Sequence, residues 1–199
     1  MPLPPAAVPR TSKNTRRVTF EGFLREDGLW DIEAHLHDVK PVDVTMSAGV
    51  HRAGDPIHEM WMRLTIDRAM NVIEVFACTD AMPYVGACDR ITPDYAKLKG
   101  HNLFRGFRKA VTGLFGDVRG CTHLNDLLMQ MPSAAVQAFA SVRGDKGGDN
   151  RNDGHKPFQL DRCHALATNS DTVQLHYAKW YRKDAPAEPE EPHTHLVRG

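Results

Sequence analysis

The chain has 199 residues, enough for one domain with a substantial core, and its 25 basic residues balance 25 acidic ones. A neutral chain lacks the electropositive surface that nucleic-acid binding usually requires. Its apolar runs are shorter than the roughly 18 residues of a membrane-spanning helix, and its N-terminus lacks a signal-peptide pattern. Four cysteines without an export signal predict reduced thiols in a cytoplasmic protein that binds neither nucleic acid nor membrane.

Three polar stretches delimit the predicted domain. Residues 1–15 are rich in proline and residues 184–199 in Pro, Glu and His, so we expect both to be disordered tails. The polar insertion 143–156 cannot contribute to a core, which leaves a surface loop, a disordered segment or a lid over a pocket. A single α+β domain is therefore expected over residues 16–183.

The N-terminal half predicts two β-hairpins. Residues 17–24 are rich in β-formers, and an Asp-Gly turn joins them to residues 29–39, which alternate apolar and polar side chains. After a polar loop over residues 44–56, a second hairpin is expected over residues 57–67 and 72–78. The last run is apolar on both faces apart from one glutamate, so it is expected to be a central strand of an antiparallel sheet.

The C-terminal half predicts helices that pack against this sheet. Thr92-Pro93-Asp94 is a typical helix start, and an apolar stripe over residues 104–115 predicts a second helix. A third helix is expected to begin at Thr122 or Asn125, and Pro132 should separate it from a further helix. Residues 173–177 fit a helix or a short strand equally well.

Cysteine and histidine occur together in two short motifs of the helical half. These are Gly120-Cys121-Thr122-His123-Leu124 and Asp161-Arg162-Cys163-His164-Ala165, while Cys88 follows the second hairpin. Thiolate and imidazole are natural ligands of zinc and iron, so the candidate ligands are Cys88, Cys121, His123 and Cys163. No CxxC or HExxH spacing supports a metal, so buried core residues or metal-free acid/base roles remain alternatives.

His58 is the first candidate for acid/base chemistry. It shares a strand face with Met60 and Met62 and is expected to point inward, either as a general base tuned by Glu59 or as a core histidine. His123 is an alternative base.

Arg63 and several aromatic residues complete the candidate site. Arg63 could bind an anionic or phenolic group, or form a structural ion pair. Tyr84 is a further candidate catalytic residue, and Trp30 and Trp61 could line an aromatic-substrate pocket or pack in the core. Nucleotide-binding and serine-hydrolase motifs are absent from the sequence, so no cofactor is expected, with zinc or iron as the alternative.

Four segments of the sequence resemble the bacterial DUF2889 family. They are residues 21–33 (EGFLREDGLWDIE), 56–67 (PIHEMWMRLTID), 119–124 (RGCTHL) and 161–166 (DRCHAL). The resemblance covers roughly residues 16–181 apart from the polar insertion. It implies a protein of bacteria that degrade aromatic compounds, and a formaldehyde-eliminating lyase that acts on lignin-derived molecules.

A fainter resemblance is to iron–sulfur cluster scaffold proteins. Ala53-Gly54-Asp55, Cys88, Cys121 and His123 follow the order of their ligands, although Ala53 stands where the first cysteine would be. The resulting prediction is a small-molecule enzyme, a carbon–carbon lyase with a small aromatic substrate. The alternatives are a metal- or cluster-binding accessory protein and a non-catalytic interaction domain. An exposed sheet edge would also permit a homodimer.

Overall fold

The computed structural model describes residues 3–144, 156–157 and 159–183. The chain divides into two compact units, residues 1–135 and 136–199, and each is described by itself. The expectation of a single domain over residues 16–183 stays a prediction. The predicted C-terminal tail and most of the polar insertion lie outside the described residues.

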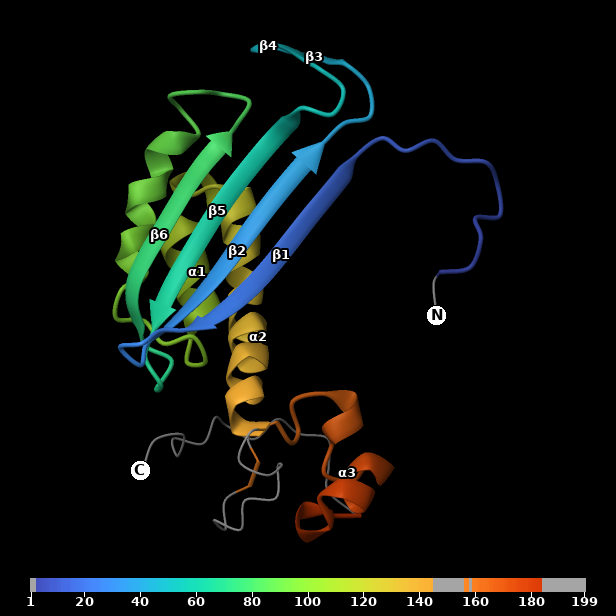
Figure 1. The fold of residues 1–199 in the computed structure, drawn as a ribbon, viewed down its shortest axis with the longest axis vertical. Helices are drawn as coiled ribbons and strands as arrows, with labels where there is room; N and C mark the ends of the chain where they lie inside the picture. Colours follow the sequence, from blue (N-terminus) through green and yellow to red (C-terminus); the bar gives the residue numbers. More distant parts are fainter. Residues whose placement is uncertain (1–2, 145–155, 158, 184–199) are drawn as a thin grey trace. The chain divides into compact units, whose positions relative to one another are not determined.

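The first unit contains a four-stranded antiparallel sheet. Its strands are β1 (Thr15–Leu24), β2 (Trp30–Val39), β5 (Pro56–Ile66) and β6 (Val72–Ala81), in the order β1-β2-β5-β6 (Figure 1). Both predicted hairpins and the α+β fold are confirmed. The predicted loop between the hairpins contains a small separate hairpin of β3 (Val44–Met46) and β4 (Gly49–His51).

The sheet has one buried face because its two central strands alternate. Along β2, Ile32 and Leu36 are fully buried, and along β5 the same is true of Met60, Met62 and Leu64. Each such side chain stabilises the fold by roughly 1.5–3 kcal/mol relative to an exposed one. The register of β2 against β5 is thereby fixed, since a slip by one residue would turn these side chains to solvent.

Helices cover this inner face. The 3₁₀ helix η1 (Asp89–Leu98) precedes α1 (Phe107–Phe115), the short 3₁₀ helix η2 (Asp117–Arg119) and the long α2 (Thr122–Gly144). Figure 1 shows α1 and the first half of α2 behind the sheet. The start of α2 at Thr122 agrees with the predicted third helix, and its apolar side chains Leu124, Leu127, Leu128 and Met131 are fully buried.

Three local predictions were wrong. Residues 72–78 lie in β6, an edge strand; η1 packs against β6 and Val72 is buried, whereas Ile73 and Phe76 are exposed. The helix expected at Thr92 begins at Asp89 and has 3₁₀ geometry. Pro132 does not interrupt α2, because the buried residues on either side of it keep the helix docked despite the lost backbone hydrogen bond.

The second unit contains short helices. They are η3 (His164–Leu166), α3 (Asp171–His176) and η4 (Ala178–Trp180). Ser170 caps α3, since its side-chain oxygen accepts a hydrogen bond from the backbone N–H of Val173. The segment that fitted a helix or a strand is therefore a helix, and Leu160, Thr168 and Val173 are buried in this unit.

Candidate functional site

Three polar side chains form a row across the inner face of the sheet. Arg16 of β1 lies opposite Asp38 of β2, and Asp38 lies opposite His58 of β5. Alternation places all three on the same face as the buried core residues. The β2–β5 register shifts directly after Asp38, and such irregularities commonly aim side chains at functional sites.

Asp38 is at the centre of this row and is only 4% exposed. Its two carboxylate oxygens accept hydrogen bonds from Arg16 Nε at 2.8 Å and Nη2 at 2.6 Å. Asp38 Oδ2 also lies 3.2 Å from His58 Nδ1. The carboxylate therefore fixes the orientation of the His58 ring.

His123 completes the cluster from the helical layer. It lies in the first turn of α2, and its ring centroid is 4.0 Å from that of His58 with a tilt of 37°. One ligand atom from each of Asp38, His58 and His123 falls within 4.8 Å of the other two. We name these three residues the Asp-His-His cluster.

Burial governs the charge states of the cluster. For Asp38, burial opposes ionisation, but the hydrogen bonds from Arg16 and His58 outweigh it and lower the pKa of its carboxyl group. For His58, burial lowers the imidazole pKa despite the opposing effect of Asp38. Burial also lowers the pKa of His123, assisted by the neighbouring charges of His58 and Arg16. At neutral pH the cluster thus contains one carboxylate and two neutral imidazoles.

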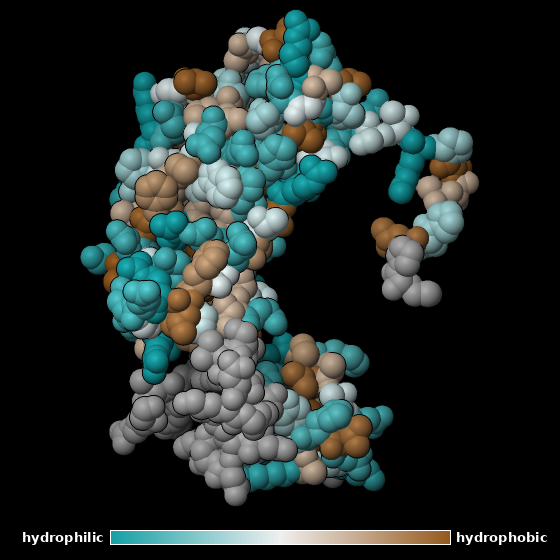
Figure 2. Space-filling model, in the orientation of Figure 1, coloured by the Kyte–Doolittle hydropathy of each residue, from teal (hydrophilic) through white to brown (hydrophobic). Residues whose placement is uncertain are grey.

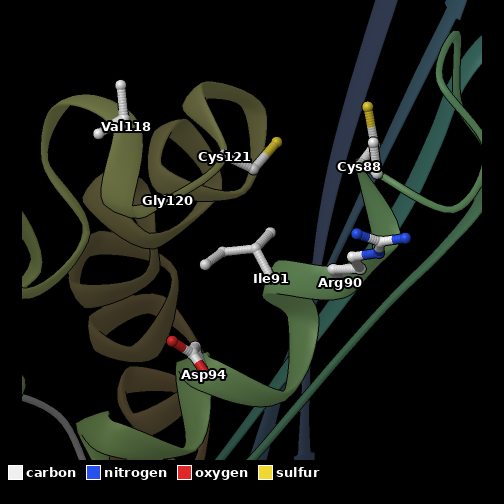
Figure 3. Close-up of a pocket in the computed structure, with 8 residues that line it drawn as sticks. Cys88, Arg90, Ile91, Asp94, Val118, Gly120 and Cys121 are labelled. Carbon is white, nitrogen blue, oxygen red and sulfur yellow. The ribbon is translucent and has the colours of Figure 1, made fainter.

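A pocket of about 390 Å³ is lined by Cys121, although Asp38, His58 and His123 are not among its lining residues. Cys121 connects the pocket with the cluster, since its Sγ is 4.0 Å from His123 Nδ1. Figure 3 shows Cys88 and Cys121 on separate segments in the upper part of the view, with Ile91 below them. Arg90 contributes the cationic group of the lining.

Tyr95 anchors the start of α2 beside the pocket. This fully buried residue accepts a hydrogen bond from the backbone N–H of Cys121 at 3.0 Å. Its hydroxyl donates to Asn125 Oδ1 at 2.8 Å. Burial raises the pKa of Tyr95, so the hydroxyl stays protonated and keeps this bridge.

Three predicted site residues lie on the opposite, outer face of the sheet. Arg63 pairs with Glu33, Glu59 accepts from His35, and Trp61 stacks on His35 with centroids 3.6 Å apart. The structure therefore does not bring them to His58, because neighbouring residues of a strand point to opposite faces. Figure 2 shows mainly hydrophilic side chains over the sheet, with single hydrophobic ones among them.

The remaining predicted residues are dispersed. Trp30 is in the core and Tyr84 is half exposed, with its hydroxyl 3.2 Å from Ser47 Oγ, so neither lines the pocket. Cys88 and Cys121 do share the pocket, whereas Cys163 is exposed in the second unit. Cys78, at the end of the apolar run 72–78, lies opposite Trp61 on the outer face.

Sequence reasoning missed Asp38 and Arg16. The signal for Asp38 was present, because it continues the alternate positions occupied by Ile32, Ala34 and Leu36 and so had to point inward. A carboxylate in that register needs a cation, and only the pairing of β1 with β2 identifies Arg16.

Comparison with known proteins identifies the family of the chain. Among the described residues, none of the helices combines the length and apolar character that a membrane crossing requires. No curated protein and no solved structure matches the chain, so the fainter resemblance to iron–sulfur scaffolds has no support. Residues 14–137 match the family described as a protein of unknown function (DUF2889). This match covers more than half of the sequence and most of the first unit, so the chain belongs to the DUF2889 family.

Proposed function

We propose that this protein is a small-molecule lyase that works by acid/base chemistry at the Asp-His-His cluster. The observation that carries the proposal is the buried Asp38, which is fixed by Arg16 and orients His58 towards a second histidine. An oriented imidazole with a lowered pKa is free to accept a proton at neutral pH. A histidine that only filled the core would need neither an oriented carboxylate nor an adjacent imidazole.

The adjacent pocket supports a small substrate. Its volume lies within the roughly 300–1,000 Å³ of small-molecule sites. Ile91, Val118 and Ala87 supply apolar lining, and Arg90 supplies a cation that would favour a phenolate or carboxylate. Asp94 also lines the pocket, and its carboxylate is paired with Lys97. Arg90 thus takes the substrate-binding role that the sequence suggested for Arg63.

The proposed reaction is release of formaldehyde from an aromatic dimer that has a primary alcohol and a benzylic oxygen substituent. His58 removes the proton of the alcohol, the bond between its carbon and the neighbouring carbon breaks, and formaldehyde leaves. The bonding electrons form a carbon–carbon double bond as the benzylic carbon–oxygen bond breaks. The imidazole pair passes the proton to the departing oxygen, so the products are an alkene, formaldehyde and an alcohol, phenol or water. His123 is the neighbouring group for this transfer.

The test is formaldehyde release from guaiacyl dimers by the purified full-length chain. General acid/base catalysis typically contributes about 10²–10⁴-fold to the rate, so His58→Gln should lose at least about 100-fold in kcat. His35→Gln is the matched control, because His35 lies on the outer face and should leave turnover unchanged.

A second pair of variants tests the pocket. Arg90→Gln should raise KM for phenolic substrates, whereas Arg63→Gln on the outer face should not. A folded His58→Gln protein that releases formaldehyde at the wild-type rate would contradict the mechanism. Absence of release from every dimer tested would end the lyase assignment.

A further inference from the structure

We infer that the Asp-His-His cluster is a binding site for one divalent transition-metal ion of the zinc type. This inference rests on the site of the proposed function and deepens it: a bound ion would supply a Lewis acid that ionises the alcohol in place of the free His58 imidazole, because the ion would hold the His58 lone pair. Two nitrogen ligands and one oxygen ligand converge there from β2, β5 and the start of α2.

The spacing of the ligand atoms fits a tetrahedral ion. Nitrogen and oxygen ligands bind zinc at about 2.0–2.1 Å, so two of them at a tetrahedral angle are roughly 3.3 Å apart. His58 Nδ1 and Asp38 Oδ2 are 3.2 Å apart, which is longer than the usual N–H···O hydrogen bond of about 2.9–3.0 Å. The ligand atom of His123 is within 4.8 Å of both. Rotation about the two side-chain torsions of His123 would bring this distance towards the roughly 3.3 Å of a tetrahedral site.

The ligand types select among metals. Magnesium and calcium prefer oxygen ligands, so a site with two imidazoles disfavours them. Zinc, cobalt and ferrous iron accept such a set, and three protein ligands leave a fourth position for water or substrate.

Arg16 is compatible with a bound cation. An ionised carboxylate has about four acceptor positions, and Arg16 occupies two of them, one on each oxygen. Carboxylates that bind metals are commonly held by such outer hydrogen bonds.

The experiment is a calorimetric titration of the tag-free, EDTA-dialysed full chain with Zn²⁺, repeated with Co²⁺ to record the visible absorption of a tetrahedral site. The variants are His123→Gln and Asp38→Asn, with His35→Gln as the matched control on the outer face. Because His193 and His195 near the C-terminus can also bind metal ions, every protein is also compared in a His193→Ala/His195→Ala background.

The expected result is one Zn²⁺ per chain at the cluster, with a tetrahedral Co²⁺ spectrum. Loss of an outer hydrogen-bond partner typically costs 10–100-fold in metal affinity, so loss of a ligand in His123→Gln should cost at least about 100-fold. His35→Gln should bind as the wild type does. Equal affinity in wild type and His123→Gln, or binding that disappears with the tail histidines, would overturn the inference.

Titration and turnover are separate measurements, so the two proposals fail separately. Formaldehyde release by the EDTA-dialysed chain, combined with no Zn²⁺ binding at the cluster, would leave the lyase and remove the metal. Zn²⁺ binding without formaldehyde release from any dimer would leave the metal site and remove the lyase. Circular dichroism of each variant shows whether it is folded before the Zn²⁺ titration and the formaldehyde assay are interpreted.

Discussion

The ion pair between Arg16 and Asp38 should be measurable as a coupling in stability. Its two hydrogen bonds join Arg16 to a carboxylate whose side chain is 6% exposed, while the Arg16 side chain is 38% exposed. A hydrogen bond to a charged group contributes about 1.5–3 kcal/mol, and loss of one partner of a fully buried pair costs about 3–5 kcal/mol. Since solvent reaches the arginine side and weakens the interaction, we expect a coupling of about 1.5–3 kcal/mol.

The assay is a double-mutant cycle of Arg16→Met, Asp38→Asn and the double variant, with urea unfolding followed by circular dichroism at pH 7. Arg16→Met should be the more damaging single change, because it leaves the buried carboxylate charged with only His58 beside it. The double variant should recover part of that loss. A coupling below about 0.5 kcal/mol would equal that of an ordinary surface pair and would refute the electrostatic reasoning.

Three further predictions concern the same unit. Because folding lowers the pKa values of His58 and His123, the unfolded chain binds more protons, so the stability of the metal-free protein should fall as pH drops from 7 through about 6.5. Melting temperatures of wild type and His123→Gln across pH 5–8 check this. An equal dependence of melting temperature on pH in the two proteins would contradict it. Tyr95→Phe should lose about 1–3 kcal/mol in urea unfolding, because the N–H of Cys121 loses its acceptor; an unchanged midpoint would show that this bridge is not stabilising. Pro132→Ala should stabilise the chain, by at most the roughly 3 kcal/mol that separates these residues in helix interiors, and a lower midpoint would show that α2 needs its proline.

Much of the sheet followed from side-chain alternation. The inward direction of His58 could be predicted because its strand has a strict two-residue period through Met60 and Met62. The same rule separates Glu59 from His58, so a site containing both was excluded by the strand pattern itself. The strand order was not accessible in this way, and β6 was misplaced because this edge strand carries apolar residues, Ile73 and Phe76, that the structure leaves exposed.

The candidate site was harder to predict than the fold. Asp38 and His58 are 20 residues apart and His123 is a further 65 along the chain, so only tertiary structure brings them together. The Cys-His motif at Cys163 predicted a metal ligand there, but Cys163 belongs to the second unit. The partners of His58 carried no motif, since a single aspartate at a strand end is unremarkable until its neighbours across the sheet are known.

The row of Arg16, Asp38 and His58 also constrains how this family can change. Each member comes from a different strand, so insertion of a single residue within any of these strands would turn one of the three side chains to the far side of the sheet. Length changes should therefore accumulate in the turns at residues 25–29 and 67–71, which lie outside the paired strands. Strand length, more than the identity of any one core side chain, is the inherited property on which the site depends.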